Sequence, residues 1–260
     1  MNQDILNEII KQDYSQIVKK TEKFLSDKIA ESGSDGIILG LSGGLDSAVI
    51  ATLCSRILKE QTLALIMPDM AVSPKNETQD ALKLIDGIGL EYKLIDINPI
   101  VGEYSKYLEP NEFAQGNLRA RVRANILYYY ANAKNYLVAG SSDKSEWLIG
   151  YFTKFGDGAS DLLPIISLYK LQVRKIAEYL GVPQEIILKK SSPHLWKDHI
   201  AEKEIGVTYE EIDCILYCVI DKGMSAEQTA DICSIDIQHV EKILRLNKNS
   251  HHKRMESARP

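Results

Sequence analysis

A glycine-rich hexapeptide is the strongest chemical signal in this sequence. It reads Ser42-Gly43-Gly44-Leu45-Asp46-Ser47, and it lies between a short apolar run that predicts a buried strand and a stretch that predicts a helix. Glycine permits positive φ and a close approach of the backbone to a ligand. The first turn of a helix offers unpaired N–H groups and a positive dipole end. We therefore predict that this loop binds phosphate groups.

Asp46 is unusual in a loop built for anions, because its carboxylate repels phosphate. A Mg²⁺ ion between Asp46 and the phosphates would resolve that conflict. The loop lacks the Gly-Lys-Ser/Thr ending of a Walker A motif. It resembles the loop of the N-type ATP pyrophosphatases, which holds the pyrophosphate as ATP is split to AMP. The resemblance implies that ATP binds to Gly40, Leu41 and the hexapeptide.

Five further motifs narrow this resemblance to one family. They are GNLRARVR at 116–123, GSSDKSE at 140–146, GYFTKFGDG at 150–158, LYK at 168–170 and HKR at 252–254. In this order, and over nearly the whole chain, they are similar to the ammonia-dependent NAD⁺ synthetases. The resemblance implies a ligase that uses ammonia and ATP to convert deamido-NAD⁺ to NAD⁺, AMP and pyrophosphate. The carboxylate of deamido-NAD⁺ is a poor electrophile, and transfer of AMP gives it a good leaving group.

The resemblance also assigns roles to individual residues. Asp46 and Lys170 are the expected catalytic residues, and Asp46 and Glu146 the expected Mg²⁺ ligands. The hydroxyls of Ser141 and Ser192 join the loop and Lys170 in binding ATP. Deamido-NAD⁺ is expected to contact Arg121, Lys154, Asp161, His252 and Lys253. Arg119, Arg121 and Arg123 cannot all share one helix face, so at least one of the three should be structural or exposed.

Two segments depart from the family pattern. Many bacterial members carry Arg before Leu-Pro after the second strand, where this chain has ALIMP at 64–68. The family often carries Gln-Thr/Ser-Asp-Glu after a Leu-Trp pair, and here Leu195-Trp196 is followed by KDHIAEK at 197–203. We expect this second segment to form a mobile lid.

The elements that must position these residues alternate between strand and helix. The segments 36–41, 62–67, 91–95 and 136–139 are expected to be strands, and 48–59 and 116–133 are expected to be helices. Ser73-Pro74 predicts the start of a further helix, with Ser73 as N-cap and Pro74 at the first helical position. This order indicates an α/β fold with a doubly wound, Rossmann-like parallel sheet, as in the adenine nucleotide alpha-hydrolases. Helical spacing at 3–31 and 168–180, and capping boxes at 208–211 and 225–228, predict helical N- and C-terminal extensions. We expect one domain over 1–260, helical from about 205.

Composition excludes several other classes. The net charge of −5 argues against a general nucleic-acid binder, and no segment is apolar and long enough to cross a membrane. Residues 1–12 lack a basic stretch followed by an apolar run, so we expect no signal peptide there. The four cysteines form no CxxC pair and are expected to be buried thiols in the cytoplasm. We expect a homodimer built on the N-terminal helix and the 116–133 helix.

Three other functions are suggested by parts of the sequence. GMP synthetase and asparagine synthetase belong to the same superfamily and activate other carbonyl groups. Residues 224–243 have a spacing similar to a helix–turn–helix, which would suit a DNA-binding regulator, but the segment is not basic. An ATP-sensing module without turnover is the third alternative, and a product assay distinguishes it from a synthetase.

Overall fold

A four-stranded parallel sheet forms the centre of the computed structural model, which describes residues 2–256. Its strands are β1 (Gly36–Gly40), β2 (Thr62–Ile66), β3 (Glu91–Leu94) and β4 (Tyr136–Ala139), in the order β3-β2-β1-β4. In the register of the sheet, Ile38 of β1 pairs with Leu63 of β2 and Val138 of β4. The four expected strands are therefore confirmed.

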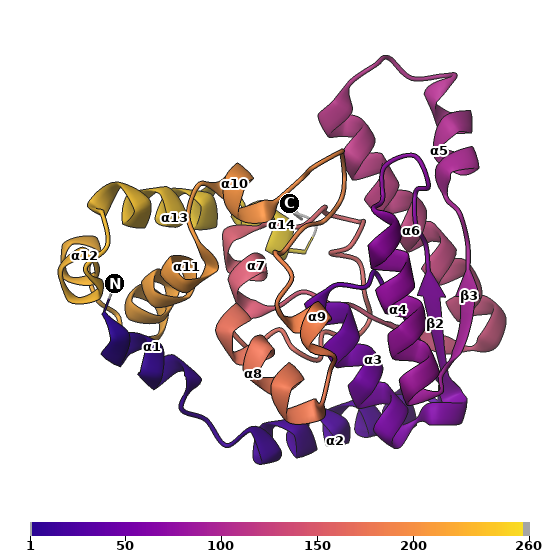
Figure 1. Cartoon of the computed structure of the whole chain (residues 1–260), viewed down its shortest axis with the longest axis horizontal. Coiled ribbons are helices and arrows are strands. Elements are labelled where there is room, and N and C mark those ends of the chain that lie inside the picture. The colour runs from indigo at the N-terminus through magenta and orange to yellow at the C-terminus, as the bar shows by residue number, and fades with distance from the viewer. Residues whose placement is uncertain (1, 257–260) are drawn as a thin grey trace.

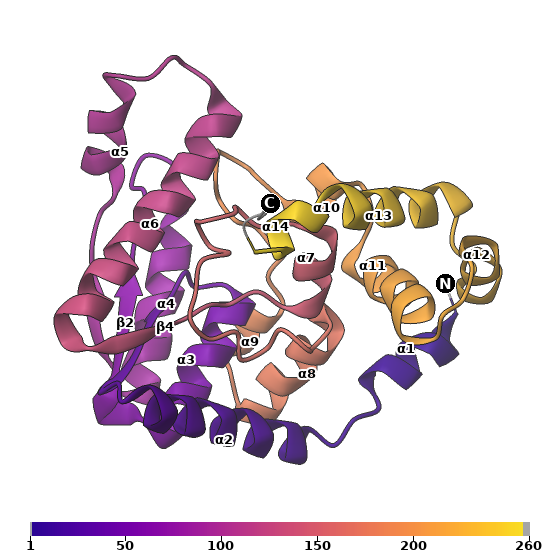
Figure 2. The same cartoon turned by 180° about the vertical axis from the view of Figure 1, so that it is seen from behind.

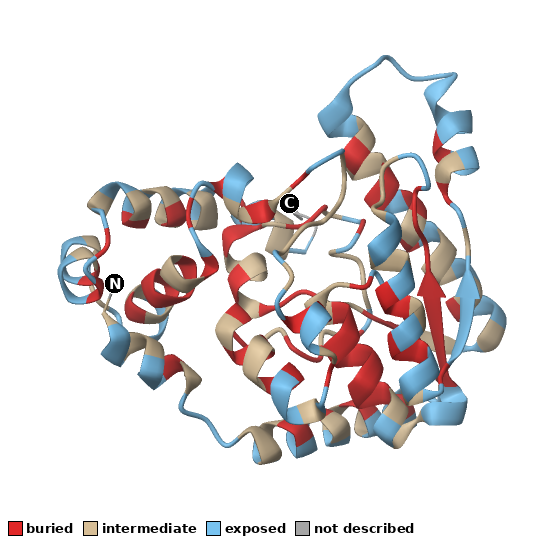
Figure 3. Ribbon diagram, viewed as in Figure 1, coloured by how far each residue is buried: buried red, intermediate tan, exposed pale blue. Residues whose placement is uncertain are grey.

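Helices cover both faces of this sheet, which confirms the doubly wound α/β fold (Figures 1 and 2). On one face an apolar core unites the sheet with α2 (Tyr14–Ser32), α3 (Leu45–Ile57), α4 (Lys75–Ile88) and α8 (Lys170–Leu180). On the other face a second core contains α5 (Asn98–Ser105) and α6 (Glu112–Lys134). Figure 3 shows the resulting burial: β2 and most of α3 are buried, whereas the edge strand β3 is exposed.

The strand order creates a switch point between β1 and β4. From β1 the chain winds outward through β2 and β3, and it then returns to place β4 on the other side of β1. Ligands of doubly wound sheets bind beyond the carboxyl ends of the strands at such a point. The loop 41–44 follows β1 and the segment 140–143 follows β4, so both lie at this edge of the sheet.

A third core joins the C-terminal helices. Its elements are α7 (Lys144–Ile149), α10 (Ala201–Ile205), α11 (Tyr209–Leu216) with a π-helical turn (Tyr217–Asp221), α12 (Ala226–Cys233) and α13 (Ile237–Asn249). Both predicted capping boxes are confirmed, at Thr208 and at Ser225. The two helices of the 224–243 segment bury their apolar faces in this core. Short helices α9 (Gln184–Ile187) and α14 (His251–Arg254) complete the chain's C-terminal part.

The N-terminal helices pack onto their own chain. Ile9 of α1 (Gln3–Ile10) is buried in the third core, and Leu25 of α2 is buried in the first. Part of each apolar face is therefore packed against the chain itself. The segment 3–31, where one or two helices were expected, forms two, because Asp13 caps a new helix by accepting a hydrogen bond from the Gln16 backbone N–H.

Some local predictions were wrong. Ser73 does not cap α4: Pro74 is the N-cap, and the Ser73 hydroxyl accepts a hydrogen bond from the Asp69 backbone N–H at 3.1 Å. Ser73 is thus held by the preceding turn. Helix α3 begins at Leu45 and not at Ala48, so the Gly-rich loop runs directly into its first turn. The short helices α5 and α7 were not expected.

Two expectations from composition can be compared with the structure. All four cysteines are buried and free, which confirms the expected burial. Among residues 2–256, no helix combines the length and the apolar character that crossing a membrane requires.

Candidate active site

The Gly-rich loop forms a narrow turn between β1 and α3. Gly43 has a φ of +85°, and a Cβ atom there would lie 2.2 Å from the Glu77 carbonyl oxygen, so the position requires glycine. The Ser42 and Ser47 hydroxyls lie 3.1 Å apart, and Ser47 donates to the Gly44 carbonyl at 3.0 Å. Gly44 is the N-cap of α3 and provides no side-chain cap, which leaves the first-turn N–H groups for an anion.

Lys189 holds this loop in place through direct contacts. Its ammonium donates to the Gly43 carbonyl at 2.9 Å and to a Glu77 carboxylate oxygen at 3.0 Å. It also forms an ion pair with Asp80 at 2.7 Å. Because α4 carries both acidic residues, Lys189 joins the loop to that helix and to the segment before the expected lid.

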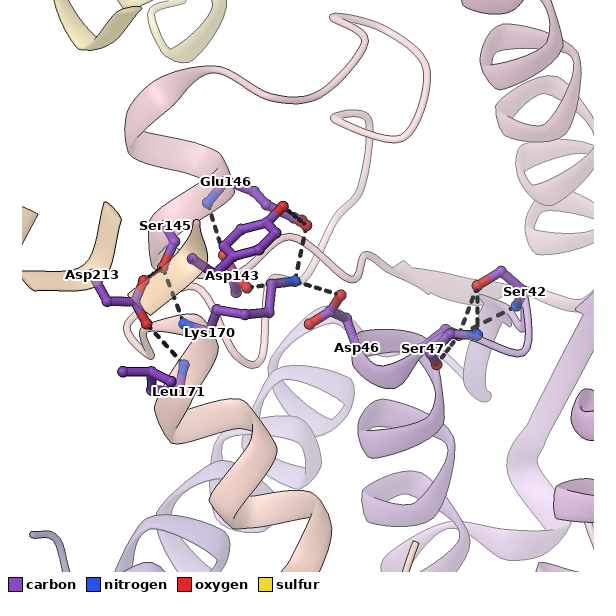
Figure 4. Close-up of polar contacts among 11 residues, drawn as sticks. Ser42, Asp46, Ser47, Asp143, Ser145, Glu146, Lys170, Leu171 and Asp213 are labelled. Atoms are coloured by element: carbon purple, nitrogen blue, oxygen red, sulfur yellow. Dashed lines mark hydrogen bonds and ion pairs between the residues drawn. The ribbon is translucent and has the colours of Figure 1, made fainter. Parts of the chain in front are cut away.

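A lysine surrounded by three carboxylates lies beside the loop (Figure 4). The Lys170 Nζ atom is 2.8 Å from Asp46 Oδ2, Asp143 Oδ2 and Glu146 Oε1 alike. Lys170 is only 1% exposed, so it is no ordinary helix-surface lysine. The structure thus brings Asp46, Glu146 and Lys170 together, and it adds Asp143, which we had not expected as a ligand.

Burial and mutual charge shift the pKa values of this cluster. Burial raises the pKa of the Asp143 and Glu146 carboxyls; the Lys170 ammonium lowers both, and the neighbouring carboxylates raise them again. Burial lowers the pKa of Lys170, but its three carboxylate partners outweigh this and hold it well above its ordinary value. The ammonium is therefore charged, and the cluster carries a net negative charge when its carboxyls are ionised.

A buried network sets the position of Lys170. The Ser145 hydroxyl accepts from the Lys170 backbone N–H at 3.0 Å and donates to Asp213 Oδ1 at 2.5 Å. The other Asp213 oxygen accepts from the Leu171 backbone N–H at 2.8 Å. These bonds cap the start of α8 and fix it against α7 and α11. Asp143 similarly caps α7, because its Oδ1 accepts from the Glu146 backbone N–H at 2.8 Å.

The loop and the cluster open into one cavity of about 370 Å³. This volume lies within the range of small-molecule sites. Every predicted ATP-binding residue except Gly43 lines it. Among the predicted site residues, those that line the cavity are Gly40, Leu41, Ser42, Gly44, Leu45, Asp46, Ser47, Ser141, Glu146, Lys170, Ser192 and Lys253.

Known proteins of similar sequence show which family has this site. The NAD synthase family model matches residues 17–257. This chain belongs to the NAD synthase family. It is 48% identical to the NH₃-dependent NAD⁺ synthetase of Hyperthermus butylicus, over 96% of this chain and 91% of that protein. It is 46% identical to the corresponding synthetase of Staphylothermus marinus, over 96% of this chain and 92% of that protein.

Solved structures of this family share the fold. NMN synthetase from Francisella tularensis superposes with a TM-score of 0.85 at 36% identity, over 96% of this chain and 99% of that one. NH₃-dependent NAD synthetase from Campylobacter jejuni superposes with a TM-score of 0.82 at 34% identity, over the same shares of the two chains. The resemblance read from the motifs is therefore confirmed.

The residues expected to hold deamido-NAD⁺ lie mostly outside the cavity. Three of them are joined: Arg121 donates to the Lys154 carbonyl at 3.3 Å, and the Lys154 ammonium donates to the His252 carbonyl at 2.8 Å. Lys253 lines the cavity and donates to the Gly150 and Phe152 carbonyls at 2.8 and 2.9 Å.

Asp161 stands apart from that group. Its Oδ2 accepts from the Val138 backbone N–H at 2.8 Å, and its Oδ1 accepts from the Tyr128 hydroxyl at 3.2 Å. The aspartate is exposed, lies beside β4 and does not line the cavity within the described residues. These bonds give Asp161 a structural role, and they leave its contact with substrate a prediction.

The three arginines of α6 differ in burial and in their contacts, as their spacing predicted. Arg119 is buried in an ion pair with Asp69 at 2.6 Å, and Arg123 donates to the Met67 carbonyl at 2.9 Å. Arg121 alone is exposed. The prediction that at least one of the three is structural or exposed is confirmed.

Proposed function

We propose that this chain catalyses the ATP-dependent amidation of deamido-NAD⁺ by ammonia, giving NAD⁺, AMP and pyrophosphate. The observation that carries the proposal is the cavity in which the phosphate loop faces Asp46, Glu146 and Lys170, with Asp143 buried behind them. Membership of the NAD synthase family and identities of 48% and 46% to NH₃-dependent NAD⁺ synthetases support it.

In this proposal, different residues of the cavity act on the pyrophosphate that leaves and on the α–β bond that breaks. The loop Ser42–Ser47 and the first turn of α3 supply N–H and hydroxyl donors for the pyrophosphate that leaves. Lys170 supplies a positive charge near the point where charge develops as the α–β bond breaks. Transfer of AMP to the nicotinate carboxylate gives an acyl-adenylate, and ammonia displaces AMP from it. Water competes with ammonia, so the surrounding segment must exclude it.

Mg²⁺ fits the carboxylate cluster. One oxygen each from Asp46, Asp143 and Glu146 lies within 4.8 Å of the others, and oxygen atoms are the preferred Mg²⁺ ligands. Asp46 Oδ1 is buried and has no hydrogen-bond partner among residues 2–256. We propose that Asp46 and Glu146 hold the ion, as the family resemblance implies, and that Asp143 joins them. When bound, the ion neutralises phosphate charge.

Deamido-NAD⁺ extends, in this proposal, from the cavity onto the surface formed by Arg121, Lys154 and His252. Lys253 lies between the two regions. Its ammonium already faces two carbonyl groups, so it is held in place before the ligand arrives. Asp161 contacts the same ligand only if the ligand reaches the end of β4. Because the cavity is lined by both Gly44 and Lys253, we also propose that 1–260 acts as one domain. Residue 1 and residues 257–260 of this domain lie outside the described residues.

We propose a homodimer formed through α6. An apolar groove lies between α5 and α6, and its lining includes Ile100, Tyr104 and Tyr129, which are 38%, 44% and 69% exposed. The edge strand β3 beside it is exposed as well. Ile5, Leu6, Ile17 and Phe24 of the N-terminal helices are only partly buried, so the expected contribution of these helices to the dimer remains part of the proposal. Sedimentation should show a dimer that Tyr129→Glu dissociates, and a monomeric wild-type protein would contradict the proposal.

A second substrate is favoured by one observation. The structure of an NMN synthetase superposes with a TM-score of 0.85, so amidation of the nicotinate mononucleotide is a competing function for the same site. Both reactions use the same carboxylate chemistry and differ in the adenylyl half of the substrate. Identities above 40% to several NH₃-dependent NAD⁺ synthetases favour the dinucleotide.

A product assay tests the proposal. The purified chain is supplied with ATP, Mg²⁺ and ammonium, together with either deamido-NAD⁺ or the nicotinate mononucleotide, and with glutamine in place of ammonium in a parallel reaction. We expect NAD⁺ and equal amounts of AMP from deamido-NAD⁺ and ammonium, with kcat/KM at least about tenfold above that of the mononucleotide. Preference for the mononucleotide would establish the second function, and no AMP from either would refute both.

A further inference from the structure

A buried histidine in the atypical segment after Trp196 has an unusual environment. His199 is 3% exposed, and its ring stacks on the Trp196 ring with centroids 3.6 Å apart and planes 13° apart. The His199 Nε2 atom lies 2.7 Å from Glu204 Oε2 and 3.0 Å from the Tyr151 hydroxyl. All four side chains line the cavity that contains the carboxylate cluster and the phosphate loop.

The hydrogen-bond network determines which ring nitrogen carries the proton. Tyr151 donates its only proton to Glu204 Oε2 at 2.7 Å. Burial raises the pKa of the Tyr151 hydroxyl, as do its hydrogen bond to Glu204 and the charge of that carboxylate, so the hydroxyl stays protonated. An unprotonated Nε2 would set its lone pair against the Glu204 carboxylate. The Nε2–H tautomer is therefore favoured, and it leaves Nδ1 with a free lone pair.

That lone pair is unused within the described chain. His199 Nδ1 is buried and has no hydrogen-bond partner among residues 2–256. A buried polar atom without a partner destabilises the fold and calls for an explanation such as a ligand or a catalytic role. A general base is often oriented by a carboxylate that contacts its other ring nitrogen. Glu204 has this place at Nε2, so it would stabilise the imidazolium formed when Nδ1 takes a proton.

We propose that His199 is the proton acceptor of the amination step, an inference that rests on the proposed function. Ammonia attacks the acyl carbon, the C–N bond forms, and the carbonyl electron pair moves to oxygen. The attached nitrogen then carries three protons and a positive charge, and His199 Nδ1 takes one of them. The carbonyl re-forms, the bond to AMP breaks, and the electron pair leaves with AMP. The amide keeps two protons, and His199 returns its proton to water after product release.

The role predicts separate effects on the two half-reactions. Formation of the acyl-adenylate needs no proton acceptor at this position, so deamido-NAD⁺-dependent exchange of pyrophosphate into ATP, measured without ammonium, should be independent of His199. Amination should depend on it by about 10²-fold or more, the usual contribution of a general base. His199→Gln is the sharpest variant, because an amide still donates to Glu204 and accepts a hydrogen bond, but it does not take up a proton.

The experiment uses the full chain and a matched control. His239→Gln removes another histidine paired with a glutamate, Nδ1 lying 3.1 Å from Glu211 Oε1, on α13 and outside the cavity. We expect His199→Gln to keep pyrophosphate exchange within about twofold, while its kcat for NAD⁺ formation falls by about 10²-fold. KM for ATP should stay unchanged. His239→Gln should match the wild type in both reactions.

A second nucleophile checks the proton step itself. Hydroxylamine is less basic than ammonia, so its adduct loses a proton to water more readily and the defect of His199→Gln should shrink at least about tenfold. Wild-type amination by His199→Gln would overturn the proposal, and so would equal loss of exchange and amination, which indicates a structural role. Absence of exchange in the wild type would instead overturn the proposed function.

Discussion

Replacing Lys170 by methionine tests the carboxylate cluster most severely. Methionine keeps much of the apolar length of the side chain but removes the one ammonium that touches all three carboxylates. The change leaves Asp46, Asp143 and Glu146 close together, with two of these side chains only 17% exposed and Asp143 fully buried. Both activity and stability should therefore fall, and they should do so in a pH-dependent way.

The size of the stability loss follows from the geometry. At an effective dielectric constant of about 20, opposite charges about 3 Å apart attract by about 6 kcal/mol per contact. Desolvation and repulsion among the carboxylates offset most of this, and removing one partner of a buried ion pair costs about 3–5 kcal/mol. For a domain of this size each kcal/mol lowers Tm by about 2–4 °C. We expect Tm to fall by roughly 6–20 °C at pH 8.

The pH dependence has a defined sign. Without the ammonium, the carboxyl pKa values of the folded state rise further above their unfolded values of about 4. The folded variant then binds more protons than the unfolded chain, so its stability increases as pH falls through the raised values. The deficit of Lys170→Met should therefore be largest at pH 8 and should shrink toward pH 5.

Thermal unfolding at pH 8 and pH 5, beside a turnover assay, provides the measurement. Lys175→Met is the control, because Lys175 lies on the same helix but pairs with Glu178 at an exposed position, 41% and 43% accessible. It should change Tm by no more than about 2 °C. A Lys170→Met protein with wild-type Tm at pH 8, or with wild-type turnover, would refute the account of the cluster.

Three further predictions concern other parts of the site. Gly43→Ala should raise KM for ATP at least about tenfold, because its Cβ would lie 2.2 Å from a carbonyl oxygen. The Cβ of Gly102→Ala meets nothing within 4 Å, so this control should leave KM for ATP unchanged, and equal KM values for the two variants would contradict the prediction. Asp213→Asn keeps only one of two acceptors, so denaturant melts should show a loss of about 1–3 kcal/mol, and an unchanged midpoint would argue against the network. Burial raises the carboxyl pKa of Asp143 to about 7 and that of Glu146 to about 8, so protons compete with Mg²⁺ for these oxygens. The half-saturating Mg²⁺ concentration should therefore rise as pH falls from 8 to 6, and a concentration that does not change with pH would count against these ligands.

Much of the fold could be predicted because its signals are local. β1, β2 and β4 are short, largely apolar runs next to turns, and the Gly-rich loop marks the junction of β1 and α3. The edge strand β3 carries Glu91 and Lys93 and is exposed. The capping boxes at Thr208 and Ser225 need only four residues each. The cap of α4 differs from the prediction because Ser73 bonds the turn before it, a choice made by the tertiary structure and not by propensity.

The site was only partly predictable, because its chemistry depends on strands meeting in space. Asp143 follows β4 and Asp46 follows β1, and only the pairing of these strands makes them neighbours. A lysine at a helix start is ordinarily exposed, and burial of Lys170 depends on α7 and α11 closing around it. Lys189 and His199 carry no motif of their own, so their partners could be found only in the folded chain.

The central claim is that AMP is transferred to the nicotinate carboxylate. Deamido-NAD⁺ labelled with ¹⁸O in that carboxylate, turned over with ATP, Mg²⁺ and ammonium, tests it directly by mass spectrometry of the products. The account predicts one labelled oxygen in the phosphate of AMP and one retained in the amide of NAD⁺. Label absent from AMP, or release of ADP with labelled inorganic phosphate, would contradict it.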